Sequence, residues 1–147
     1  MYRHLIAVAL LTIPGIAYAD DDVMEVGGEY LANVRNFELL SAGECKAYPP
    51  IWKRSSEKAE RWVLSLLPSK DQGEFSKILP QLRSMMAESS ENFLRVNYKS
   101  IKDKYRSTEQ SCAYAYGFIE GLIIPPETKL SVMEHKMKGR VTVIRTR

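Results

Sequence analysis

The sequence contains few of the residues on which enzyme active sites and metal centres most often depend. It has two histidines and two cysteines in 147 residues. His4 lies in an N-terminal stretch that we expect to be removed, which leaves His135. No pair of histidines or cysteines has the spacing of a zinc site, and no glycine-rich phosphate loop or G-x-S-x-G motif occurs. We therefore expect a protein that is not an enzyme, with no metal and no other cofactor.

Long apolar runs are also scarce, and the longest one stands at the N-terminus. Arg3 precedes an apolar stretch over residues 5–16, and Ala17-Tyr18-Ala19 follows it. A charged start, an apolar stretch and an A-x-A exit are typical of a secretory signal peptide, whereas a membrane-spanning helix needs roughly 20 apolar residues. The sequence predicts a signal peptide at residues 1–19 and a periplasmic mature chain over residues 20–147, with no transmembrane segment.

A strong excess of one charge is absent as well. The whole chain carries 21 basic and 18 acidic residues, a formal net charge of +3. This is too mild to favour nucleic acid as a partner, and export makes that partner less plausible still. The basic residues concentrate in two places, over residues 95–106 and in the tail. We take Arg95, Lys99 and Lys102 as candidate contacts for an acidic partner, the alternative being a solvated helix face.

Both cysteines, Cys45 and Cys112, fall in the predicted mature chain. In an oxidising compartment an even number of cysteines favours a disulfide. The bond would close a loop with 66 residues between its ends, and the chain-entropy model gives it about 4 kcal/mol of stabilisation. The alternative is two unpaired, buried cysteines.

Apolar residues recur at helical spacing along most of the mature chain. The pattern predicts about five helices, over residues 23–42, 52–66, 69–79, 81–105 and 109–124, with Pro80 either dividing or kinking the third and fourth. Gly27 and Gly28 weaken the first turns, so the first helix is expected to begin near Glu29. Residues 69–72 and 107–110 both match the capping-box pattern. The fold class is thus all-α, in a single domain.

The C-terminal segment is compatible with two structures. Pro125-Pro126 is expected to end the fifth helix. Residues 129–138 then form either a short helix that Gly139 stops or, together with the following residues, a small β-hairpin. Residues 139–147 are an uncertain tail.

One helix carries a row of small residues. Ala113, Gly117 and Gly121 are four residues apart and share one helix face, which predicts close packing against another backbone. The alternative is a surface that receives a partner. Glu120 is the sole charge between Gln110 and Pro126. We expect it to face water and count it as a candidate partner contact; the alternatives are a perturbed acid or a buried salt-bridge partner.

Three motifs together resemble a known family. They are the helix end at residues 37–45, the stretch Cys112-x-x-x-Tyr116-Gly-Phe-Ile-x-Gly121, and the proline-led segment at residues 125–130. These resemble the periplasmic immunity proteins that protect bacteria against the peptidoglycan amidases of type VI secretion systems. The resemblance implies a helical, disulfide-bonded protein that binds a cell-wall hydrolase and blocks its active site, often as a homodimer.

The leading hypothesis is therefore a periplasmic immunity protein that neutralises a peptidoglycan amidase by binding it. The alternative is a periplasmic chaperone-like or stress factor that binds several clients through methionine- and aromatic-rich surfaces around Met85, Met86, Met133 and Met137.

Overall fold

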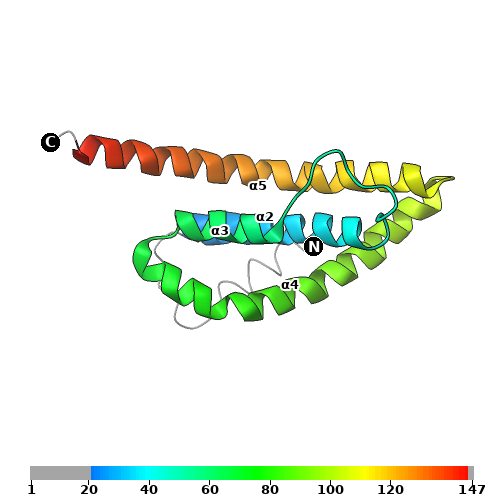
Figure 1. The fold of residues 1–147 in the computed structure, drawn as a ribbon, viewed down its shortest axis with the longest axis horizontal. Helices are drawn as coiled ribbons and strands as arrows, with labels where there is room; N and C mark the ends of the chain where they lie inside the picture. Colours follow the sequence, from blue (N-terminus) through cyan, green and yellow to red (C-terminus); the bar gives the residue numbers. More distant parts are fainter. Residues whose placement is uncertain (1–20, 146–147) are drawn as a thin grey trace.

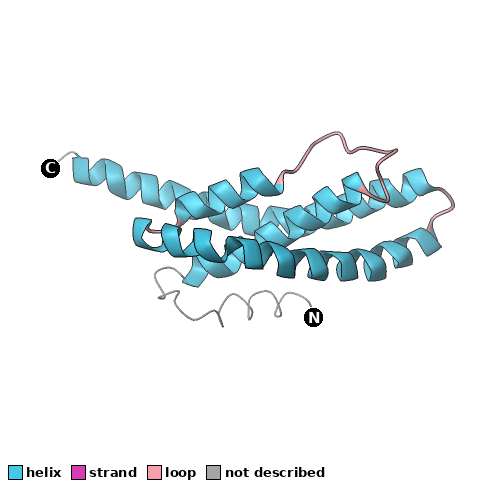
Figure 2. Ribbon diagram, turned by 60° about the horizontal axis from the view of Figure 1, so that its bottom comes forward, coloured by secondary structure: helices cyan, strands magenta, loops and turns pink. Residues whose placement is uncertain are grey.

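The computed structural model describes residues 21–145, and they form four helices joined into one elongated bundle (Figure 1). The helices are α2 (Asp21–Ala42), α3 (Ser56–Leu66), α4 (Ser69–Lys104) and α5 (Thr108–Arg145). Every regular element in these residues is a helix (Figure 2), so the all-α prediction is confirmed. The predicted signal peptide at residues 1–19 lies outside the described residues.

Helix α2 is the centre of the bundle, because α3, α4 and α5 each make their most extensive contact with it. Its side chains Val23, Val34, Phe37 and Leu40 are each 1% exposed. The helix begins at Asp21, so the expectation that it starts near Glu29 is wrong. Gly27 is a close-packing position in this helix: a Cβ atom there would lie 2.7 Å from Cγ1 of Val63 in α3. The cost of glycine in a helix is thus offset by the approach of α3.

Prolines end neither of the two long helices, which is why there are fewer helices than the five expected. Helix α4 continues through the exposed Pro80 and follows a curved path in Figure 1, as the kink alternative predicts. Helix α5 continues through Pro125 and Pro126. Pro126 cannot donate a hydrogen bond to the carbonyl of Leu122, but Nδ2 of Asn33 in α2 donates to that carbonyl instead, at 3.4 Å. The neighbouring helix therefore replaces the missing donor.

Helix starts follow the capping signals only in part. Helix α3 begins after Ser55, whose Oγ accepts from the Lys58 N–H, so Trp52 lies in the preceding loop and not in the helix as expected. Ser107 accepts from the Gln110 N–H at 3.2 Å, which is the predicted cap. Ser69 instead is the first residue of α4, and Pro68 occupies the cap position without a side-chain hydrogen bond. The first capping-box prediction is wrong because the helix begins one residue too early for it.

The tail is helical. The backbone stays in α5 as far as Arg145, so the hairpin alternative is wrong for the part of the tail that the structure describes. In Figure 1 this end of α5 extends beyond α2 and α3, and the end of α4 that joins α5 lies at the opposite end of the molecule.

Candidate protein-binding site

A connection without regular structure crosses the surface of α5 between the end of α2 and the start of α3 (Figure 1). We call residues 43–55 the strap. Two turns open it, with the Lys46 N–H donating to the Gly43 carbonyl and the Tyr48 N–H to the Cys45 carbonyl. Pro49 and Pro50 follow, and their rings restrict the backbone further. The strap is fixed to α5 near both of its ends.

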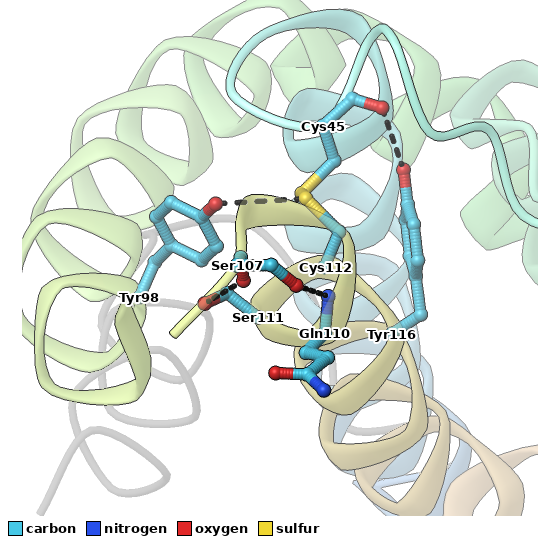
Figure 3. Close-up of a disulfide and its surroundings, with 7 residues drawn as sticks. All are labelled: Cys45, Tyr98, Ser107, Gln110, Ser111, Cys112 and Tyr116. Atoms are coloured by element: carbon cyan, nitrogen blue, oxygen red, sulfur yellow. Dashed lines mark hydrogen bonds between the residues drawn. A yellow bond between two sulfur atoms is a disulfide. The ribbon is translucent and has the colours of Figure 1, made fainter. Parts of the chain in front are cut away.

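The first attachment is the disulfide between Cys45 and Cys112, which confirms the predicted bond. Both cysteines are fully buried. Figure 3 shows Tyr98 and Tyr116 on either side of it, with the Tyr98 hydroxyl 3.5 Å from Sγ of Cys112 and the Tyr116 hydroxyl donating to the Cys45 carbonyl at 3.5 Å. Burial raises the pKa of both tyrosine hydroxyls. The covalent attachment is thus enclosed by aromatic side chains and shielded from water.

The second attachment is an ionic cluster around Arg54. Its guanidinium donates to both carboxylate oxygens of Glu120, with Nε 3.2 Å from Oε2, and to Glu127, with Nη1 2.6 Å from Oε1. Trp52 Nε1 also donates to Oε2 of Glu120, at 3.1 Å. The side chains of Arg54 and Glu120 are 18% and 14% exposed. Hydrogen bonding to Glu120 raises the pKa of Arg54 well above its ordinary value, so the guanidinium of Arg54 stays protonated.

Glu120, Glu127 and Glu134 follow one another at intervals of seven residues, so they share one face of α5. Each carboxylate accepts from the strap or from α3: Glu134 accepts from Trp62 Nε1 at 3.0 Å, and its hydrogen bonds with Lys138 and Trp62 lower its pKa. Sequence reasoning missed this acidic row, although the seven-residue spacing was visible. The expectation that Glu120 faces water is wrong, because Arg54 and Trp52 occupy its carboxylate; the salt-bridge alternative is correct.

Between its two attachments the strap presents an apolar tip to solvent. Ile51 is 97% exposed, and Trp52 and Tyr48 are 44% and 39% exposed. Among the large hydrophobic side chains that the structure describes as exposed, Ile51 is the most exposed by a wide margin. Lys46 and Lys53 flank this tip and are exposed as well. An apolar side chain held fully in water on an anchored loop is the arrangement expected of an anchor for a partner's pocket.

The row of small residues on α5 is exposed and not packed. Ala113, Gly117 and Gly121 face solvent, and a Cβ atom added at Gly117 or Gly121 would meet nothing within 4 Å. The prediction of close helix packing at this row is therefore wrong within the described chain. The reason is that α2 packs against the opposite side of α5, where Cys112, Ile119 and Ile123 are buried.

The basic candidates do not take part in the strap. Arg95, Lys99 and Lys102 are exposed on α4, and Arg95 donates to Oδ1 of Asn92 at 2.8 Å. This part of α4 lies at the end of the molecule opposite the projecting end of α5 (Figure 1). The two basic regions therefore do not form one continuous surface.

A groove lies between α2, α3 and α4, with a volume of about 220 Å³. Arg35, Glu38, Glu60 and Arg83 line it. Arg35 pairs with Glu38 at 3.0 Å and Arg83 with Glu60 at 2.6 Å. Because these charges satisfy one another, the groove is a weaker candidate for a binding site than the strap.

Among the side chains that the structure describes, no group of three histidine, cysteine or acidic residues is arranged to hold a metal ion. None of the helices in residues 21–145 combines the length and the apolar character needed to cross a bilayer. No family model, curated protein or solved structure matches this chain.

Proposed function

We propose that this chain is a periplasmic immunity protein that binds a secreted peptidoglycan amidase and covers its active site. The observation that supports this proposal most directly is the anchored strap with its exposed tip at Ile51. The motif resemblance described above and the secretory pattern of residues 1–19 agree with the same role.

Anchoring matters because a flexible loop loses conformational entropy when it binds. A disulfide at one end and an ion-pair cluster at the other hold the strap in one conformation before a partner arrives. This lowers the entropic cost of association. In this proposal Ile51 fills an apolar pocket of the amidase, Trp52 and Tyr48 pack around the pocket's rim, and Lys46 and Lys53 meet acidic groups beside it.

The chaperone-like alternative has less support from the surface. Of its four methionines only Met85 is exposed, whereas Met86 is buried and Met133 and Met137 are half-buried against the core. These side chains do not form a broad adaptable patch of the kind that binds many unrelated clients.

The test is affinity capture from an extract of the organism that encodes the chain, with the mature protein and two variants as bait. Ile51→Asp removes the proposed anchor. Val96→Asp is the matched control, because Val96 is also an exposed β-branched residue, on α4, at 52%. We expect wild type and Val96→Asp to retain one stoichiometric partner with peptidoglycan amidase activity, which free mature protein inhibits.

We expect Ile51→Asp to lose both capture and inhibition, because its affinity for the partner should fall by about 30-fold or more, as when a hot-spot residue is removed. Equal capture by all three baits would contradict the role of the strap. Capture of many unrelated proteins at similar levels would favour the chaperone-like alternative.

A further inference from the structure

The strap owes little of its order to burial. Of residues 43–55, Cys45 is the one buried residue, three others are half-buried and the remaining nine are exposed. A segment with so little apolar contact gains little from the hydrophobic effect, which elsewhere in a protein offsets the entropy lost when the chain is ordered. The conformation of the strap therefore depends on its two attachments to α5.

The first attachment consists of little besides the disulfide. The N–H of Cys45 donates to the Leu40 carbonyl of α2 at 3.0 Å, and the two turns that follow are bonded within the strap itself. The hydroxyl of Tyr116 in α5 donates to the Cys45 carbonyl at 3.5 Å, which is long for a hydrogen bond. Without the sulfur–sulfur bond, that one weak polar contact would join the first half of the strap to α5.

The second attachment fixes the far end of the strap. Trp52 and Arg54 both donate to Glu120, immediately before α3 begins, whereas residues 46–51 lie between this cluster and Cys45. A segment held at one end samples many conformations, and ordering it when a partner binds lowers the affinity. A fixed position for the tip at Ile51 therefore requires both attachments.

Once formed, the disulfide is out of reach of thiols in solution. Both cysteines are 0% exposed, and Figure 3 shows Tyr98 and Tyr116 on either side of the bond. Thiol–disulfide exchange requires a thiolate to attack one of the two sulfur atoms directly. Reduction of the folded protein must therefore wait until the structure opens, whereas a loose strap leaves the thiol of Cys45 accessible to an oxidant.

We propose that Cys45 and Cys112 form a one-way redox switch that fixes the strap in its binding conformation. Before oxidation the helices are folded and the first half of the strap is loose. The two thiols then exchange with a disulfide, of a small molecule or of another protein. This step forms the Cys45–Cys112 bond and leaves the oxidant as two thiols.

The switch rests on the proposed function only in the identity of its partner. Reducing conditions prevail inside the cell, and disulfides persist in oxidising compartments outside the cytoplasm. The chain would thus bind the amidase after export and leave it free in the cytoplasm where both proteins are made.

The test compares the oxidised mature chain with two forms that lack the bond. These are wild type refolded in dithiothreitol under nitrogen and the variant Cys45→Ser/Cys112→Ser. Trypsin cuts after the exposed Lys46 and Lys53, on either side of the tip. Because cleavage follows the population of the open segment, we expect both forms to be cut there about tenfold faster or more. The control is Leu82→Ala, which removes a buried side chain of α4 and should be cut at the oxidised rate.

Glutathione disulfide should restore slow cleavage to reduced wild type, with a mass decrease of two hydrogens, and should not change the double serine variant. Cleavage of both unbonded forms at the oxidised rate would overturn the proposal. Loss of the helices on reduction, measured by circular dichroism, would also overturn it, since the bond would then hold the whole fold. Rapid reduction of the folded, oxidised protein by dithiothreitol would refute the one-way character.

A second measurement uses the amidase captured by the oxidised protein in the preceding experiment. The apparent affinity falls with the fraction of chain in the binding conformation. We therefore expect both unbonded forms to bind the amidase about tenfold more weakly or worse, and equal affinity would overturn the proposal. If no amidase is captured, the proposed function fails, and the cleavage rates still decide whether the disulfide controls the strap.

Discussion

Replacing Arg54 by alanine should release the strap while leaving the helices folded. The substitution leaves Glu120 and Glu127, whose side chains are 14% and 31% exposed, without their cationic partner. An exposed ion pair contributes about 0–1 kcal/mol, and removal of one partner from a fully buried pair costs about 3–5 kcal/mol. These carboxylates lie between the two cases. We therefore expect Arg54→Ala to lower the free energy of unfolding by about 2–3 kcal/mol, which corresponds to a Tm lower by roughly 8–12 °C in a domain of this size.

Urea denaturation measures the loss of unfolding free energy, and limited digestion with trypsin tests whether the strap is the part that is released. Trypsin can cut the strap after Lys46 and Lys53, both exposed. We expect faster cleavage at these sites in Arg54→Ala under native conditions. Because the disulfide joins Cys45 to α5, the fragments must be resolved after reduction. A double-mutant cycle of Arg54→Ala with Glu120→Ala should yield a coupling of about 1.5–3 kcal/mol.

Arg61→Ala is the control, since Arg61 pairs with Glu57 across one helical turn and both side chains are more than half exposed. We expect it to change stability by less than about 0.5 kcal/mol. The reasoning is refuted if Arg54→Ala matches this control in stability and wild type in the rate of cleavage within the strap.

Three other predictions follow from the core and from the exposed face of α5. Gly27→Ala should destabilise the protein by about 1–2 kcal/mol because the new methyl group meets Val63. Gly121→Ala should instead stabilise the protein by about 0.5–1 kcal/mol, because alanine has the higher helix propensity. The urea midpoints of the two variants measure both changes. Cys112→Ser should cost about 3–4 kcal/mol of stability, and dithiothreitol should reduce the buried bond of wild type only when urea is also present, as a mass increase of two hydrogens reports. Burial raises the pKa of three tyrosine hydroxyls above the unfolded value of 10.0. Their contribution to the stability of the folded protein is therefore complete below about pH 10 and is lost as the pH rises through the folded pKa values. Urea midpoints at about pH 8, 10 and 11 measure this loss of stability, and an unchanged midpoint at about pH 11 would contradict the prediction. The three are Tyr30, Tyr98 and Tyr116.

Helix periodicity and cysteine count predicted much of this fold. The core positions of α2 and the pairing of Cys45 with Cys112 follow from spacing and from an even number of cysteines. The continuation of α5 through Pro126 could not be predicted, since it depends on a donor from Asn33 that is 93 positions away in the sequence. Rules based on local sequence treat a proline as a helix break because they do not include hydrogen bonds from a neighbouring helix.

The packing of the helical glycines could not be predicted from the sequence either. Gly27 and Gly121 both interrupt helical patterns, yet one contacts Val63 and the other faces open space. Sequence spacing shows that small residues share a face but not which face the bundle covers. The strap was not predicted for a related reason. Trp52 fits the helical spacing of α3, so it was assigned to that helix. Its place in a loop depends on contacts with α5, namely its own hydrogen bond to Glu120 and the ion pairs of Arg54.

The disulfide also determines how the protein would respond to a pulling force. Cys45 and Cys112 are 67 positions apart, and α3 and α4 both lie between them. Tension applied at the two ends of the chain passes along α2, through the sulfur–sulfur bond and along α5, and bypasses the enclosed helices. About 240 Å of extended chain, at roughly 3.6 Å per residue, therefore stays out of reach of the force until the bond is reduced. Single-molecule stretching should show an unfolding length shorter by that amount in oxidising than in reducing buffer.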